Sequence, residues 1–187
     1  LDDLRAAARE LAEPIPVLLF DDLKAPLPRS RRAALTFTPD AATEAALLYT
    51  SGTTGRPKGC VLTNEYFLYW GQWFLSRGHT LALKEGEERL YNPLPLHHAN
   101  ALSISLPTML VAGGCLVFPD RFHASTFWDD IVNCGVTAIQ FQGVIPAILL
   151  KLPQTKQERA HRVKFVLCAG CEPNLHEQFE RRYGFPL

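Results

Sequence analysis

The residues from Thr50 to Gly59 have the composition of a loop that binds phosphate groups. These ten residues contain three glycines, four hydroxyl side chains and two cations, and they follow an apolar run. Glycine lets the backbone turn tightly and approach a ligand closely. Hydroxyls donate hydrogen bonds to phosphate oxygens, and successive N–H groups in a turn form a concavity that binds anions. The pattern predicts a polyphosphate site; the alternative is a polar surface loop between two strands.

The order of these residues is specific. A Walker A loop needs Gly-Lys-Ser/Thr after a four-residue gap, whereas here Lys58 follows Pro57 and precedes Gly59. The run from Leu48 to Gly59 instead resembles the phosphate-binding signature of the AMP-forming adenylating enzymes: acyl-CoA and aryl-CoA synthetases, luciferases and the adenylation domains of peptide synthetases. The resemblance implies that this loop holds the β- and γ-phosphates of ATP, with Lys58 also acting in catalysis. The implied nucleotide contacts are Thr50, Ser51, Gly52, Thr53, Thr54, Gly55 and Lys58.

A histidine pair forms the second chemical motif. The segment from Pro95 to Ala101 resembles the family's Pro-x-x-His signature, whose register selects His98 as the functional histidine. In relatives this histidine lies at the mouth of the acyl pocket, where an imidazole can orient the carboxylate against the α-phosphate. The resemblance therefore implies a catalytic role for His98, and pocket positions for His98, Ala99 and Asn100. Without the resemblance, these would be ordinary histidines at a strand-to-helix turn.

The segment from Leu167 to Pro173 resembles the family segment that often reads Gly-Gly-Ala-Pro, whose backbone lies along the adenine. This implies nucleotide contacts at Gly170, Cys171 and Glu172. The sequence departs from the family pattern because Cys168 and Cys171 replace small residues and Glu172 adds a charge. Cys168 and Cys171 could instead join the histidine pair in a redox or zinc site. One Cys-x-x-Cys without a second pair is a weak signal, and we predict no metal site.

A further strand end precedes the residues Gln142, Gly143 and Val144. In the family this position forms one wall of the acyl pocket, so the resemblance implies pocket roles for all three. Gln142 is equally consistent with a polar group at the start of a helix. If Gln142 faces the pocket, a polar or short acyl group is favoured over a long fatty chain.

These motifs must be positioned by alternating strands and helices. Apolar runs predict strands, while capping residues, early prolines and terminal glycines bound the helices. The expected strands are 46–50, 58–62, 89–93, 115–118, 137–141 and 163–168. The expected helices are 64–77, 99–112, 126–134, 144–152 and 173–183. This alternation predicts an α/β fold with a mainly parallel sheet and helices on both faces. The resemblance assigns it to the large N-terminal domain of an acyl-CoA-synthetase-like fold.

The chain divides at about residue 44. Residues 1–44 are expected to hold a helix (2–13), a strand (15–20) and a linker (25–40) rich in proline and arginine. Residues 45–187 are expected to form an AMP-binding α/β subdomain. In relatives, a Tyr-Gly-x-Thr-Glu segment and a mobile C-terminal domain come later.

Composition narrows the class of protein. Hydrophobic residues make up 47% of the chain, and 19 basic residues balance 19 acidic ones. That balance gives no reason to expect nucleic acid or an anionic membrane surface as a partner. The longest apolar stretch, 102–118, is interrupted by Pro107 and two glycines, so no membrane span is predicted, and no signal peptide is predicted from the first residues. Five scattered cysteines indicate reduced thiols in a cytoplasmic protein.

The expected function is therefore that of an ATP-dependent ligase. The resemblance implies that a carboxylic acid is converted to an acyl-adenylate and then to a thioester of coenzyme A. It implies Mg²⁺, with the glutamate ligand beyond Leu187, and the remaining domains of the same enzyme as partners. The 187 residues alone are predicted to be inactive. An adenylation domain that loads a carrier protein and a non-catalytic nucleotide-binding scaffold remain as alternatives, and the sequence does not indicate the acid or the oligomeric state.

Overall fold

The computed structural model describes residues 2–10, 12, 37–50 and 55–187. The chain forms two compact units, Leu1–Thr38 and Pro39–Leu187. In the first unit the structure describes helix α1 (Asp2–Arg9), within the helix expected over 2–13. The strand predicted at 15–20 and the arginines of the expected linker lie outside the described residues.

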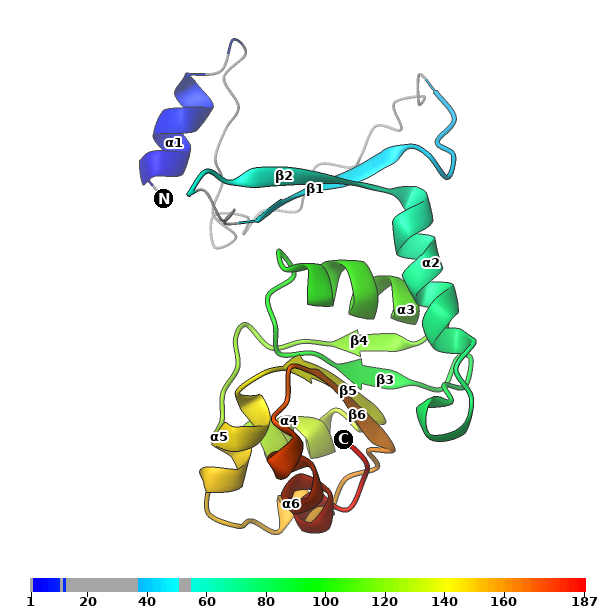
Figure 1. The fold of residues 1–187 in the computed structure, drawn as a ribbon, viewed down its shortest axis with the longest axis vertical. Helices are drawn as coiled ribbons and strands as arrows, with labels where there is room; N and C mark the ends of the chain where they lie inside the picture. Colours follow the sequence, from blue (N-terminus) through cyan, green and yellow to red (C-terminus); the bar gives the residue numbers. More distant parts are fainter. Residues whose placement is uncertain (1, 11, 13–36, 51–54) are drawn as a thin grey trace, which may run out of the picture. The chain divides into compact units, whose positions relative to one another are not determined.

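A four-stranded parallel sheet organises the second unit (Figure 1). Its order is β4–β3–β5–β6, in which β3 pairs with β4 and β5, and β5 pairs with β6. The strands are β3 (Arg89–Tyr91), β4 (Cys115–Val117), β5 (Ala138–Gln142) and β6 (Phe165–Ala169). All four were expected from the sequence, and the prediction of a mainly parallel α/β sheet is confirmed.

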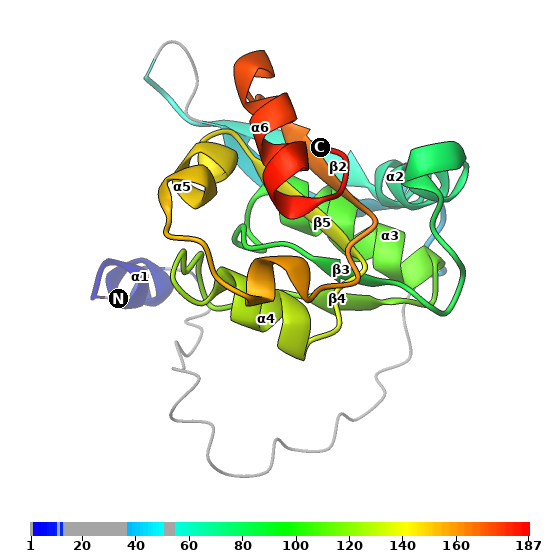
Figure 2. The same cartoon turned by 90° about the horizontal axis from the view of Figure 1, so that it is seen from below.

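Helices cover both faces of this sheet (Figure 2). Successive strand residues point to opposite faces, so Tyr91, Ile139 and Val166 enter one core while Leu90, Ala138 and Phe165 enter the other. The first core is closed by α4 (Phe127–Asn133), α5 (Ile145–Lys151) and α6 (Pro173–Tyr183). The second is closed by α2 (Asn64–Leu75) and α3 (Leu106–Val111). Each large apolar side chain buried in this way contributes about 1.5–3 kcal/mol.

Strands β1 (Glu44–Thr50) and β2 (Lys58–Thr63) form a separate antiparallel hairpin. Both were expected as strands, but they do not join the parallel sheet. The reason is the connection: parallel neighbours need a crossover of a dozen or more residues, whereas a short loop joins antiparallel strands. Only seven residues separate Thr50 from Lys58 in the sequence, and these two residues pair directly.

The helix expected over 99–112 has two parts. A π-helical segment, η3 (Asn100–Ser105), runs directly into α3. Pro107 gives a physical reason, because proline has no N–H to donate and its ring would clash with the carbonyl of Ser103 in a regular α-turn. The wider π turn avoids that clash, and such segments occur frequently at functional sites.

A buried carboxylate joins the beginnings of the strands. The side chain of Glu88 is fully buried and accepts hydrogen bonds from Lys164 Nζ (2.5 Å), Thr137 Oγ1 (2.5 Å) and the N–H of Lys84 (2.8 Å). Burial alone would raise its pKa, but these hydrogen bonds outweigh burial and hold the pKa below its ordinary value. The ionised carboxylate therefore stabilises the edge of the sheet where the strands begin.

Candidate active site

Three of the predicted motifs meet at one edge of the parallel sheet. The histidine segment follows β3, Gln142 ends β5, and Gly170 follows β6. Because β3, β5 and β6 are parallel neighbours, their carboxyl ends lie side by side, which is where α/β folds bind ligands. The register places Gln142 opposite Ala169, and the N–H of Gly143 donates to the carbonyl of Ala169 at 2.9 Å.

His98 lies on an exposed turn between β3 and η3. Its N–H donates to the carbonyl of Pro95 (3.0 Å), and its own carbonyl accepts from the N–H of Leu102 (3.0 Å). The rings of His97 and His98 lie against each other with centroids 4.7 Å apart. Both side chains are exposed, so the imidazole of His98 is accessible to a carboxylate.

The two predicted pocket residues after His98 differ in exposure. Ala99 is exposed, whereas Asn100 is only 7% exposed. The Oδ1 of Asn100 accepts a hydrogen bond from Asn92 (2.8 Å). The Asn100 side chain is thus held inside the fold, and its contact with an acyl group stays a prediction.

Two glycines with left-handed backbone lie next to each other across β5 and β6. Gly143 has φ +55° and Gly170 has φ +73°, a conformation that favours glycine. A Cβ added to either would meet no atom within 4 Å. The backbone beside them is therefore uncovered, with Gln142, Val144 and Glu172 also exposed around it. A planar group can lie close to such a surface.

The thiols of Cys168 and Cys171 are free. Burial raises the pKa of Cys168 to about 12 and raises that of Cys171 above its ordinary value. Because the thiolate is the form that ligates metals and attacks disulfides, protonated thiols are poorly suited to either reaction at neutral pH. Within the described part of the chain, no group of three or more His, Cys, Asp or Glu residues is arranged to hold a metal ion.

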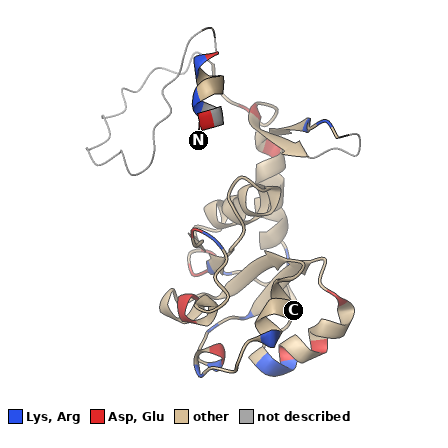
Figure 3. Ribbon diagram, turned by 90° about the vertical axis from the view of Figure 1, so that its left-hand side faces the viewer, with Lys and Arg blue, Asp and Glu red and all other residues tan. Residues whose placement is uncertain are grey.

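The hairpin carries the described part of the phosphate-loop motif. Thr50 and Lys58 are exposed and face each other at the strand ends, and Gly55 has φ +78°. Figure 3 shows basic residues at this end of the hairpin. The predicted contacts Ser51, Gly52, Thr53 and Thr54 lie outside the described residues. In the described ranges, no hydrogen bond or ion pair joins Thr50, Gly55 or Lys58 to the sheet edge.

The AMP-binding enzyme family matches residues 2–187 of the chain. The chain belongs to this family. It is 37% identical over 97% of its length to sulfoacetate–CoA ligase of Cupriavidus necator, of which it covers 36%. It is 35% identical over 85% of its length to long-chain fatty acid transport protein 2 of Rattus norvegicus, of which it covers 24%.

A solved structure gives the same family assignment. O-succinylbenzoate coenzyme A synthetase of Bacillus subtilis, in complex with AMP, superposes with a TM-score of 0.64 and 29% identity, covering 79% of this chain and 36% of that one. The chain therefore spans a quarter to about a third of the length of these relatives. The prediction of an acyl-CoA-synthetase-like fold is confirmed.

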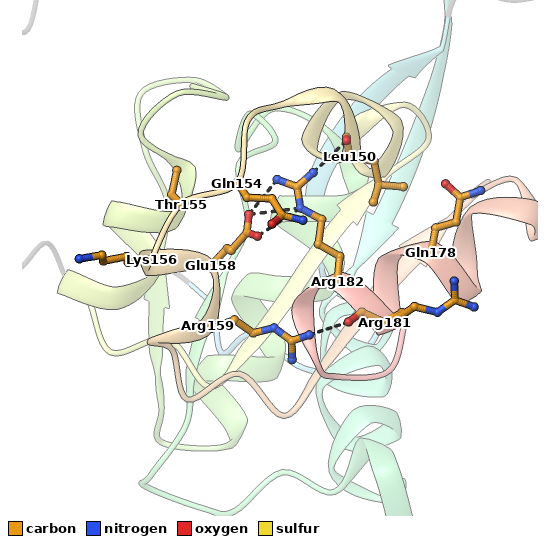
Figure 4. Close-up of a pocket in the computed structure, with 9 residues that line it drawn as sticks. All are labelled: Leu150, Gln154, Thr155, Lys156, Glu158, Arg159, Gln178, Arg181 and Arg182. Carbon is orange, nitrogen blue, oxygen red and sulfur yellow. Dashed lines mark hydrogen bonds and ion pairs between the residues drawn. The ribbon is translucent and has the colours of Figure 1, made fainter.

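A cavity of about 630 Å³ between α5 and α6 lies away from this edge (Figure 4). Its central charged groups are paired: the guanidinium of Arg182 binds Glu158 (2.8 Å) and the carbonyls of Leu150 (2.9 Å) and Leu152 (3.0 Å). These carbonyls are the ones that the end of a helix leaves without partners. In this AMP-binding family member the cavity therefore reflects the capping of α5.

Asn92 and Ser105 are the residues beside the site that the sequence analysis missed. Both side chains are fully buried and hydrogen-bonded to each other at 2.7 Å. The available signal was the presence of polar residues inside apolar runs, where a buried polar group requires a partner.

Proposed function

We propose that the enzyme containing this sequence activates a carboxylic acid with ATP and transfers the acyl group to coenzyme A. The observation that carries the proposal is the meeting of the His98, Gly143 and Gly170 segments at the carboxyl edge of a parallel sheet, in a chain that belongs to the AMP-binding family. Relatives described as CoA ligases support the same reaction class.

The first half-reaction joins the acid to AMP. A carboxylate oxygen attacks the α-phosphorus, the bond to the bridging oxygen breaks, and pyrophosphate leaves. His98 orients the carboxylate, and the backbone at Gly170, Cys171 and Glu172 lies along the adenine. Lys58 and the loop hydroxyls hold the leaving phosphates, which aligns the reactants and stabilises the developing charge.

The second half-reaction forms the thioester. The thiol of coenzyme A loses its proton as its sulfur attacks the acyl carbon, the carbon–oxygen bond to AMP breaks, and AMP leaves. We propose that Mg²⁺ accompanies the phosphates of the nucleotide substrate, as the family resemblance implies. We also propose a cytoplasmic location, on the grounds of the five free thiols.

The identity of the acid substrate can be determined with a panel of carboxylic acids. An apolar groove of about 700 Å³ runs along η3 and α3, lined in part by Leu102, Leu106 and Leu110. If the exposed side chain of Gln142 faces the acyl pocket, a short or polar acid is favoured instead. The panel should therefore run from sulfoacetate to long-chain fatty acids, which are the acids in the names of the relatives.

The deciding experiment is carboxylate-dependent ATP–pyrophosphate exchange by the full-length protein, followed by thioester formation with coenzyme A. Exchange with at least one acid is the expected result. ATP binding without exchange for any acid would indicate a nucleotide-binding scaffold. Exchange followed by transfer only to a carrier protein would indicate a carrier-loading domain. The 187 residues alone are expected to give no exchange.

A further inference from the structure

Four buried polar side chains form a hydrogen-bonded cluster between β3, η3 and β5. Asn92, Asn100, Ser105 and Gln140 are between 0% and 7% exposed. The Nδ2 of Asn92 donates to Asn100 Oδ1 (2.8 Å) and to Ser105 Oγ (2.7 Å), and Ser105 Oγ donates to Gln140 Oε1 (2.7 Å). Because each broken bond would leave a buried polar atom without a partner, the cluster favours one arrangement.

The carboxamide of Asn92 holds both ends of the segment that carries His98. Its Oδ1 accepts from the N–H of Leu94 (2.8 Å), at the start of that segment. Its Nδ2 reaches Asn100, the first residue of η3, at the end of it. Asn92 is itself fixed to the sheet, since its N–H donates to the carbonyl of Val117 (2.9 Å).

The π-helical form of η3 makes this arrangement possible. In an α-helix, residues five apart point about 140° away from each other, at 3.6 residues per turn. A π-helix is wound more widely, with i→i+5 hydrogen bonds, so Asn100 and Ser105 come closer to the same face. Both can then accept from the single Nδ2 of Asn92.

We propose that Asn92 is a positioning residue for His98 and acts together with Ser105 and Gln140. The inference rests on the proposed function, in which His98 orients the carboxylate. A displacement of the imidazole by about 1 Å would lower the rate about 100-fold. Buried hydrogen bonds that fix the segment carrying His98 are therefore expected to affect catalysis. Gln140 lies two residues before Gln142 on the same face of β5. The strand therefore connects the hydrogen-bonded cluster to the predicted wall of the acyl pocket.

The test compares Ser105→Ala with Ser103→Ala in the full-length enzyme. Both serines are fully buried in η3, but Ser103 Oγ has no hydrogen-bond partner among the described residues, whereas Ser105 joins Asn92 to Gln140. Ser105→Ala is expected to lower kcat/KM for the carboxylate about tenfold with the KM for ATP unchanged. Ser103→Ala should leave both constants at the wild-type level.

A double-mutant cycle separates positioning from general destabilisation. In a His98→Ala background, Ser105→Ala should have no further effect on adenylation, because the group it positions is gone. An additive loss would overturn the inference and leave only a structural role.

Hydrogen exchange of the 93–105 segment gives a readout that needs no substrate. Faster exchange in Ser105→Ala than in Ser103→Ala is expected, and equal exchange would overturn the inference whatever the activity. If the wild-type enzyme shows no pyrophosphate exchange with any acid, the proposed function fails. The hydrogen-exchange rates of the 93–105 segment still decide whether the cluster orders the loop.

Discussion

Replacing Gly170 by alanine tests whether the backbone after β6 touches the nucleotide. Gly170 has φ +73°, and an added Cβ would meet nothing within 4 Å. Gly86 provides a matched control, since its φ is +74° and its added Cβ also meets nothing within 4 Å. Gly86 precedes β3 and donates its N–H to Ala112 (2.8 Å), so it lies at the opposite edge of the sheet.

The two substitutions should have the same effect on stability. A left-handed backbone costs alanine about 1–2 kcal/mol, and the reduced entropy of the unfolded chain offsets about 0.4–1 kcal/mol of that. The net loss is about 1 kcal/mol for each, with no clash added. The effect on ATP should differ. A methyl group on a surface that touches the base costs about 1–3 kcal/mol, or 10–200-fold, so only Gly170→Ala should raise the KM for ATP, by at least tenfold.

Both variants of the full-length enzyme should be measured by pyrophosphate exchange across a range of ATP concentrations, with urea unfolding as the stability measurement. Equal KM values for ATP in Gly170→Ala and Gly86→Ala would refute the nucleotide contact. A KM raised in both would show that backbone strain, and not proximity to the base, is responsible.

Three other substitutions test the rest of the account. Glu88→Gln should remove the part of the stability that the ionised carboxylate provides: in wild type this part is fully present above about pH 4.5, the ordinary pKa, and is lost as the pH falls through the lowered folded-state pKa. Urea unfolding from pH 3 to 7 should therefore show a flatter profile in the variant, and an unchanged profile would contradict the ion pair with Lys164. Lys58→Ala should raise the KM for ATP or slow pyrophosphate exchange at least tenfold, whereas substitution of Lys156, another exposed lysine away from the site, by alanine should not; equal rates would remove Lys58 from the site. Phe127→Ala should destabilise the domain by about 3–5 kcal/mol, because Phe127 is fully buried; a loss below about 1 kcal/mol in urea unfolding would show that the core collapses around the gap.

Local signals were sufficient to predict the parallel sheet and most helices. Pro146 and Pro173 lie in the first turns of α5 and α6, and Gly184 follows α6 in a left-handed conformation. These residues act within one turn of the chain, so their effect can be read from sequence. The separate hairpin required knowing that a short loop excludes a parallel pairing.

The candidate site was predictable only in part. Periodicity indicates where β3, β5 and β6 end, and parallel pairing brings those ends together. Roles for His98 and Gly170 came from the family resemblance, and they remain predictions. The cluster around Asn92 could not be predicted, because Asn92, Ser105 and Gln140 are separated by up to 48 residues and meet only through tertiary packing.

The π turn of η3 makes the geometry around His98 sensitive to chain length as well as to residue type. Adding one residue between Asn100 and Ser105 would place them six apart, about 120° apart around an ordinary helix, and so carry the two side chains to different sides. The Asn92 carboxamide could then satisfy one of them but not both. A single-codon insertion would thus loosen the histidine loop while every residue that holds it stayed in the sequence.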